Sequence, residues 1–142
     1  HQREINLFAA ETLPRVIMNT VALKRVVTNM IENAIRYSDE AIDVSTAYNP
    51  RKKMVIVTVK DRGPGIPEAE LETVFEPFKQ GDQARGSEGS GLGLAIIKRI
   101  VATHGGTVKL RNRKEGGLSA EVYLPAQTTW DHSNRSNLPF KQ

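Results

Sequence analysis

Apolar residues recur at helical spacing between Val21 and Tyr37. Side chains three and four positions apart share one face of an α-helix, so this pattern predicts an amphipathic helix with one buried side. Asn19 or Thr20 can cap its first turn by accepting a hydrogen bond from a free backbone amide. The predicted apolar stripe consists of Leu23, Val26, Val27, Met30, Ile31, Ala34 and Ile35.

Segments typical of β-strands lie on both sides of this helix. Residues 4–10 and 15–18 are expected to form two short strands before it. In residues 41–47, apolar and polar side chains alternate, which predicts a strand with one buried face. Residues 54–60 are rich in β-branched side chains and are expected to form its hairpin partner.

A second and a third helix are predicted in the middle of the chain. Pro67 followed by two glutamates is typical of a helix start, because proline suits the first turn and carboxylates suit the positive end of the helix dipole. Apolar residues at helical spacing continue this helix to Phe78. The third helix is expected from Gly91 to His104, closed by Gly105 and Gly106 in a left-handed cap.

The remaining chain is predicted to contain a loop, a hairpin and a tail. Residues 79–90 are polar and small, and a loop of this length inside a compact domain is usually functional. Residues 107–112 and 118–124 form the expected hairpin. We therefore predict an α/β two-layer sandwich in residues 1–126, with a mixed sheet covered on one face by three helices, and a polar tail at residues 127–142.

Composition narrows the possible functions. The 142 residues are enough for one domain, and none of them is cysteine, which excludes disulfides and thiolate metal sites. No apolar run approaches the roughly 18 residues of a membrane span. The net charge is +4, but the basic residues alternate with acidic ones and only residues 51–53 form a basic run, so no nucleic-acid partner is expected.

Polar residues at helical spacing give the first helix a second face. Asn29, Glu32, Asn33 and Arg36 combine two carboxamides, a carboxylate and a guanidinium. Such a set suits a cation together with a polyanion. A polar face that only contacts solvent is the alternative interpretation.

Asp61-x-Gly63-x-Gly65 follows the strand at residues 54–60. A carboxylate at a strand end can accept a hydrogen bond from a ligand, and the two glycines let the backbone approach a planar group closely. An adenine offers an amino donor to such a carboxylate, whereas guanine offers an acceptor there. An ordinary turn is the alternative, because Gly-Pro-Gly is typical of turns.

The glycines at residues 89–93 precede the third helix and expose amides at its positive end, which suits an anion such as phosphate. A P-loop is excluded, because Leu94 and Ala95 stand where it requires Lys and Ser or Thr. A dinucleotide-binding fingerprint is excluded as well, because polar residues rather than a strand precede these glycines. A flexible loop entering a helix is the alternative interpretation.

Taken together, these motifs resemble the four boxes of sensor histidine kinases in the family's order. Residues 29–37 resemble the N box, 61–66 the G1 box, 75–78 the F box and 90–94 the G2 box. The match covers about residues 4–125. Asn33-Ala-Ile-Arg-Tyr37 and Gly81-Asp-Gln-Ala-Arg85 are similar to the osmosensing members of the family.

The resemblance implies a Bergerat-type ATP-binding fold, shared with gyrase, Hsp90 and MutL, and a role for each matched residue. Asn33 would coordinate Mg²⁺ with Asn29 beside it, Arg36 would meet phosphate, Tyr37 would line the adenine and ribose, and Asp61 would take the adenine amino group. The floor of the pocket would be Gly63, Gly65 and Ile66. The F box and the lid would contribute Phe78, Lys79, Gln80, Gly81, Arg85, Ser90, Gly91, Leu92, Gly93 and Leu94.

One position departs from the family pattern. Many members carry an arginine just after the F-box phenylalanines, where this chain has Gln80. Lys79 or Arg85 is a candidate for the missing charge, and the sequence does not decide between them.

The resemblance is compatible with two kinds of enzyme, one that hydrolyses ATP and one that transfers its phosphoryl group to a protein. Hydrolytic members of the wider superfamily carry a glutamate four residues before the magnesium asparagine, and here that position is Asn29, whose carboxamide is not a competent base. Glu32 lies about 100° around the helix from Asn33. Phosphoryl transfer to a protein is therefore expected rather than hydrolysis, and a non-catalytic binding module is disfavoured by intact Asn29, Asn33 and Asp61.

The acceptor histidine is not expected within this chain. None of His1, His104 and His132 lies in a His-Glu/Asp-Leu-Arg-type helix, and His104 is expected to pack at or cap the end of the third helix. The resemblance therefore implies a separate dimerisation and phosphoacceptor domain of the same kinase as a partner, with a response regulator downstream. The catalytic domain in this chain is expected to be monomeric in isolation. In the full-length protein it is expected to lie on the cytoplasmic side of an inner-membrane sensor.

Overall fold

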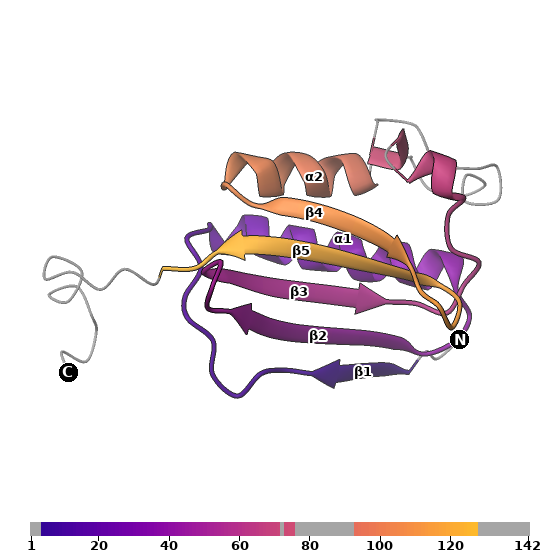
Figure 1. The fold of residues 1–142 in the computed structure, drawn as a ribbon, viewed down its shortest axis with the longest axis horizontal. Coiled ribbons are helices and arrows are strands. Elements are labelled where there is room, and N and C mark those ends of the chain that lie inside the picture. Colours follow the sequence, from indigo (N-terminus) through magenta and orange to yellow (C-terminus); the bar gives the residue numbers. More distant parts are fainter. Residues whose placement is uncertain (1–3, 72, 76–92, 128–142) are drawn as a thin grey trace, which may run out of the picture.

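The computed structural model describes residues 4–71, 73–75 and 93–127. They contain a five-stranded mixed sheet in the order β1-β2-β3-β5-β4 (Figure 1). β1 runs parallel to β2, and the other neighbouring pairs are antiparallel. The strands are β1 (Ile5–Phe8), β2 (Ile42–Asn49), β3 (Met54–Lys60), β4 (Thr107–Asn112) and β5 (Leu118–Pro125).

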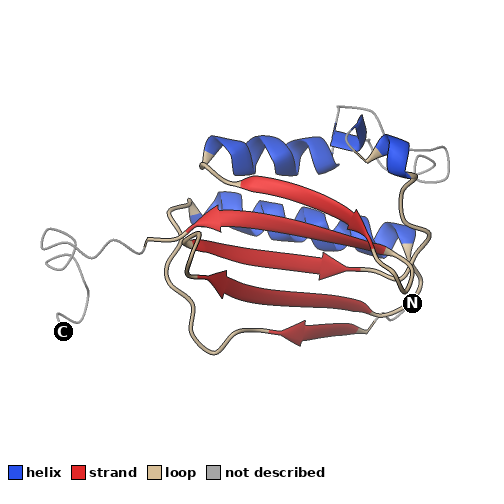
Figure 2. Cartoon of the chain, in the orientation of Figure 1, coloured by secondary structure: helices blue, strands red, loops and turns tan. Residues whose placement is uncertain are grey.

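Two α-helices, α1 (Thr20–Tyr37) and α2 (Gly93–Thr103), cover one face of this sheet (Figure 2). α1 contacts α2, β2 and β3, whereas α2 lies over β4 and β5. The predicted two-layer α/β architecture with a mixed sheet is confirmed. No helix in the described ranges has the length and apolar character needed to cross a membrane.

α1 forms where the sequence predicts it. The Asn19 carboxamide oxygen accepts hydrogen bonds from the backbone amides of Val21 (2.7 Å) and Ala22 (3.2 Å), which satisfies two amides that have no partner within the helix. Every fourth residue from Val26 to Ala34 is buried. Arg36 in the last turn complements the negative end of the helix dipole.

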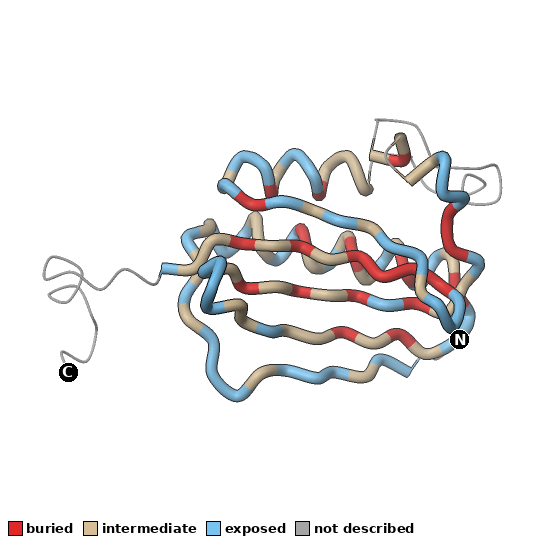
Figure 3. The backbone as a smooth tube through the Cα atoms, in the orientation of Figure 1, coloured by how far each residue is buried: buried red, intermediate tan, exposed pale blue. Residues whose placement is uncertain are grey.

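The core lies between the helices and the sheet (Figure 3). β2 buries Ile42 and Val44 on alternate positions, as the sequence pattern predicts for its start. β3 buries every second residue, and β5 is buried along most of its length. The edge strand β1 is mostly exposed. The main cluster consists of Val26, Met30, Ala34, Ile42, Val44, Val59, Ile97, Val101, Ala120, Val122 and Leu124.

The strand expected at residues 15–18 is wrong. This segment makes a single antiparallel bridge, from Val16 to Ala126 just after β5. Its backbone reaches only the last residues of β5 and those beyond, through bonds from Ile17 N to Pro125 O (3.4 Å) and from Gln127 N to Arg15 O (2.7 Å). A longer ladder does not form, because these bonds reach only residues 125–127 rather than the length of a strand, although Val16 and Met18 pack against the core.

The α-helix expected from Pro67 to Phe78 is also wrong over its described part. Two short 3-10 turns, η1 (Glu68–Glu70) and η2 (Thr73–Phe75), take its place, so two α-helices rather than three cover the described sheet. The Thr73 hydroxyl donates to the carbonyl of Glu70 (3.2 Å), and such a bond competes with helical backbone pairing. Phe78 lies outside the described residues.

α2 ends with the predicted left-handed glycine. Gly105 has φ +82°, and the next amide, of Gly106, donates to Val101 O (2.9 Å). The expected role of His104 at the helix end is confirmed, because its Nδ1 bonds the Ile100 carbonyl (2.8 Å).

Candidate functional site

The polar flank of α1 borders its buried stripe. Asn29 and Asn33 are half-buried and lie four residues apart, so their carboxamides are neighbours on the helix surface. Glu32 is exposed. It lies two positions after buried Met30, about 200° around the helix, and therefore on the side away from the core.

Asp61 lies directly after β3 and is 2% exposed. Its Oδ1 accepts hydrogen bonds from the backbone amides of Gly63 (2.9 Å) and Leu118 (3.0 Å). Its own amide donates to Leu118 O (2.9 Å), which continues the pairing of β3 with β5 by one residue. Burial of a carboxylate is costly unless it accepts hydrogen bonds, and these amides reduce that cost.

The last turn of α1 meets the segment that follows Asp61. A Cβ at residue 63 would lie 2.2 Å from the carbonyl oxygen of Tyr37, so only glycine permits this approach. The Ser38 hydroxyl accepts a hydrogen bond from the amide of Arg62 (3.4 Å). Asn33 and Tyr37 therefore come from the end of α1 that packs beside Asp61.

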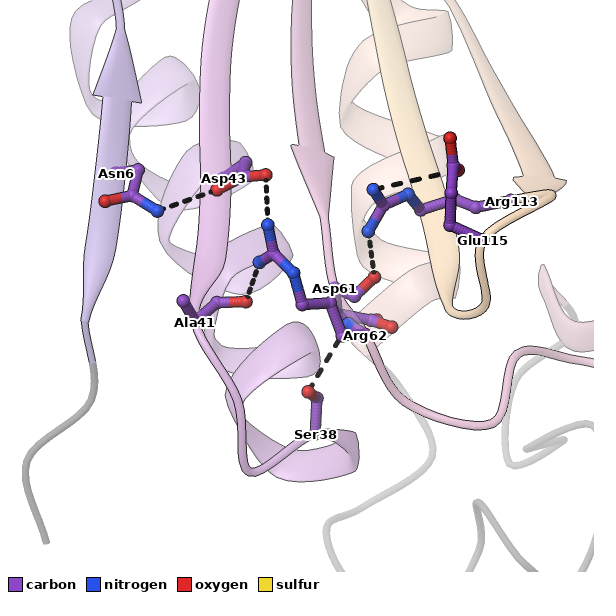
Figure 4. A network of polar contacts seen from close by, with 8 residues as sticks. All are labelled: Asn6, Ser38, Ala41, Asp43, Asp61, Arg62, Arg113 and Glu115. Atoms are coloured by element: carbon purple, nitrogen blue, oxygen red, sulfur yellow. Dashed lines mark hydrogen bonds and ion pairs between the residues drawn. The ribbon is translucent and has the colours of Figure 1, made fainter.

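Arg62 ties the same segment to β2 (Figure 4). Its guanidinium donates to the Ala41 carbonyl and pairs with Asp43 Oδ2 at 2.8 Å. Asn6 of β1 donates to Asp43 Oδ1 (2.9 Å). The hydrogen bond from Asn6, followed by the hydrogen bond and charge of Arg62, lowers the pKa of Asp43 from its ordinary value against the opposing effect of partial burial.

The β4–β5 hairpin contacts this segment through the last residue of β4 and the first residue of the turn. Arg113 Nη1 donates to the Asp61 carbonyl (2.7 Å). The Asn112 carboxamide accepts from the amide of Ile66 (2.9 Å) and donates to the carbonyl of the same residue (2.7 Å). Sequence reasoning missed both residues, because they belong to none of the four motifs and continue an ordinary strand-and-turn pattern.

Other predicted site residues are placed as follows. Arg36 is exposed near the end of α1, and Gly65 has φ +76°, which favours glycine. Ile66 is buried with Val74 and Leu118. Gly93 begins α2, and Leu94 packs against both hydrophobic clusters. Outside the described residues lie Phe78, Lys79, Gln80, Gly81, Arg85, Ser90, Gly91 and Leu92.

Residues 18–128 match the family model described as histidine kinase-, DNA gyrase B- and HSP90-like ATPase. The chain belongs to this ATPase family. The match spans α1, the Asp61 segment and the β4–β5 hairpin, so all three parts of the candidate site belong to the ATPase domain.

Known relatives of this ATPase domain are sensor kinases. The sensor protein KdpD of Escherichia coli is 36% identical over 87% of this chain, and the match covers 14% of that protein. The sensor histidine kinase GtrS of Pseudomonas aeruginosa is 42% identical over 82% of this chain and 23% of its own length. The chain thus spans less than a quarter of the length of these two relatives.

Solved structures agree with this assignment. The histidine kinase domain of the E. coli osmosensor EnvZ superposes with a TM-score of 0.68 at 39% identity, covering 92% of this chain and 80% of that one. This similarity in sequence and structure confirms the predicted resemblance to an osmosensing kinase.

The side chains of this ATPase domain fit magnesium and a purine nucleotide. The carboxamide oxygens of Asn29 and Asn33 are the kind of ligand that Mg²⁺ accepts. The buried carboxylate of Asp61 can accept a hydrogen bond from a base, and the missing side chains of Gly63 and Gly65 let Tyr37 and Asn112 pack closely against the segment that follows it. An open cleft between η1, η2 and β4 has none of the predicted site residues in its lining.

Proposed function

We propose that this chain is the catalytic domain of a two-component sensor kinase. It binds Mg-ATP and donates the γ-phosphoryl group to a histidine on a separate dimerisation and phosphoacceptor domain. The observation that carries the proposal is the almost fully buried Asp61 carboxylate, beside the end of the helix that bears Asn29 and Asn33.

Each end of the nucleotide has a proposed set of partners. Asp61 accepts the adenine amino group, Tyr37 lines the base and ribose, and Gly63, Gly65 and Ile66 form the floor. Asn33, with Asn29, holds Mg²⁺, and Arg36 contacts phosphate. Bound Mg²⁺ supplies positive charge that neutralises the phosphates, and the chain contributes by holding the nucleotide in position for in-line transfer.

The orientation of Glu32 favours transfer over hydrolysis. A general base must lie within hydrogen-bond reach of the water that it activates. Glu32 is exposed on the side of α1 away from the core, and Asn29 cannot act as a base. A hydrolytic ATPase of the gyrase or HSP90 kind is the second candidate, supported by the family to which the chain belongs.

The surrounding protein is part of the proposal. Residues 1–126 form the catalytic domain and 127–142 a polar tail. Phe78 belongs to the F box, and the loop residues Lys79, Gln80, Gly81 and Arg85, with Ser90 to Leu94 at the base of the lid, contact the phosphates. The domain acts on the cytoplasmic side of an inner-membrane sensor, and the phosphorylated histidine then serves a response regulator.

A phosphotransfer assay tests the proposal. The chain is incubated with Mg²⁺ and γ-labelled ATP, alone and with the dimerisation and phosphoacceptor domain of its full-length kinase. We expect label on the acceptor histidine in the mixture and no label on this chain in either sample. Label on this chain alone, or none on the acceptor, would contradict the proposal.

Two variants separate transfer from hydrolysis. Asn33→Asp changes a neutral magnesium ligand into a charged one beside the phosphates and is expected to lower transfer at least tenfold, a loss of roughly 1.4 kcal/mol of transition-state stabilisation. Glu32→Gln is expected to leave transfer unchanged. A fast steady-state ATPase that disappears in Glu32→Gln would instead establish the hydrolytic alternative.

A further inference from the structure

The segment from Asp61 to Ile66 is a loop without a regular pattern of backbone hydrogen bonds. It belongs to no helix or strand in the structure, although it carries the proposed adenine-binding carboxylate. A loop can bind a ligand selectively only if neighbouring groups hold its geometry. The contacts that reach this loop from elsewhere in the chain therefore bear on nucleotide recognition.

Asn112 supplies two of these contacts. Its carboxamide accepts from Ile66 N at 2.9 Å and donates to Ile66 O at 2.7 Å, across 46 residues of sequence. This exchange of both bonds copies the hydrogen-bonded pair of an antiparallel sheet. The Asn112 side chain at the end of β4 thus pairs with the backbone of Ile66 as a neighbouring strand would, although Ile66 lies in a loop.

Arg113 and the end of the hairpin fix the other end of the loop. Arg113 Nη1 holds the carbonyl of Asp61 at 2.7 Å, and its side chain is only 16% exposed. The amide of Leu118 donates to Asp61 Oδ1 at 3.0 Å. The end of β4, the turn and the start of β5 therefore contact the backbone and the carboxylate of Asp61 together with the backbone of Ile66.

We propose that Asn112 and Arg113 are positioning residues for adenine recognition. They hold the first and last residues of the Asp61–Ile66 loop at a fixed separation, so that the Asp61 carboxylate faces the base in the correct orientation. This inference rests on the proposed function, because it assumes that Asp61 binds adenine. Neither residue needs to touch the nucleotide.

A matched pair of variants tests the role of Asn112. Asn112→Ala removes both bonds to Ile66. Asn49→Ala is the control, because the Asn49 carboxamide likewise accepts backbone amides, those of Arg51 (3.0 Å) and Lys52 (3.2 Å), but in the turn at the opposite end of β2 and β3. Dissociation constants for Mg-ATP and Mg-GTP are measured on the 142-residue chain by displacement of a fluorescent ATP analogue, and far-UV circular dichroism checks folding.

A change in base selectivity distinguishes positioning from general destabilisation. Asn112→Ala is expected to weaken Mg-ATP binding about tenfold, which is the order of losing the one hydrogen bond between Asp61 and the adenine amino group. The preference for ATP over GTP should fall by a similar factor. Asn49→Ala is expected to leave both unchanged. A folded Asn112→Ala variant with unchanged ATP affinity, or with equal losses for the two nucleotides, would overturn the inference.

Arg113 provides an independent variant if Asn112→Ala does not fold. Arg113→Met removes the donor to the Asp61 carbonyl and is expected to lower the ATP preference, and Arg113→Lys, which keeps a cationic donor, should restore part of it. An equal preference for ATP over GTP in Arg113→Met, Arg113→Lys and the unchanged chain would refute the inference. If the unchanged chain binds neither nucleotide, the proposed function itself fails, which is a distinguishable result.

Discussion

Asp43 is an example of a residue outside the motifs whose ionisation matters for stability. Its carboxylate accepts from Asn6 and pairs with Arg62, and these partners lower its pKa below the ordinary value of 3.8. Because the folded pKa is lower than the unfolded one, the stabilisation is complete above about pH 5 and is lost as pH falls through the unfolded and then the folded pKa.

We predict a specific pH dependence from this shift. The free energy of unfolding should fall below about pH 5 more steeply in the unchanged chain than in Asp43→Asn, which has no carboxylate to protonate. Urea unfolding at a series of pH values measures both slopes. Asn6→Ala should give an intermediate slope, since the Asn6 hydrogen bond is the largest cause of the shift. Parallel curves for all three proteins would show that the ion pair does not contribute.

At the scale of elements, the β4–β5 turn depends on one glycine. A Cβ at residue 117 would lie 2.0 Å from the carbonyl oxygen of Asp61, and φ there is +97°. Gly116 has a similar φ of +105°, but apart from its two chain neighbours no described atom lies within 4 Å of its Cβ position. An alanine at residue 116 therefore reports only the cost of the positive φ, whereas an alanine at residue 117 also reports the cost of a clash with Asp61.

The pair of alanine variants gives a graded prediction. Gly116→Ala should lower the free energy of unfolding by about 1–2 kcal/mol, the cost of a positive φ for a residue with a Cβ. Gly117→Ala should cost at least about 1–3 kcal/mol more, because the hairpin must move away from Asp61. Urea unfolding measures both. Equal losses in the two variants would mean that the close approach to Asp61 is not required.

Local patterns predict the elements that local interactions determine. The Asn19 cap, the buried stripe of α1, the alternation at the start of β2 and the Gly105 cap all follow from spacing and were expected. The strand at residues 15–18 and the helix after Pro67 were not correctly predicted. Distant contacts decide the first, because Val16 bridges only to Ala126 beyond β5. The second is decided locally, because the backbone after Pro67 pairs three residues apart, from Glu70 N to Pro67 O, and the Thr73 hydroxyl adds a bond to the Glu70 carbonyl.

At the scale of the whole molecule, the sheet order assembles the candidate site. β3 pairs with β5 rather than with β4, and this brings Leu118 against Asp61 across 57 residues of sequence. The motifs identified Asn33, Asp61 and the glycines, because their residue types carry the chemistry. They did not identify Asn112, Arg62 or Arg113, because a hydrogen bond to a distant backbone group leaves no repeating pattern in the sequence.

Asp61→Asn most directly tests whether the Asp61 carboxylate recognises the nucleotide. The substitution replaces one carboxylate oxygen by an amide NH2 group, and the remaining carboxamide oxygen can still accept from the amides of Gly63 and Leu118. Calorimetric titration with Mg-ATP should show that the unchanged chain binds and that Asp61→Asn binds about 1–3 kcal/mol more weakly, the value of a charge-assisted hydrogen bond to the adenine amino group. Equal affinities in two folded proteins would contradict the assignment of this carboxylate to nucleotide recognition.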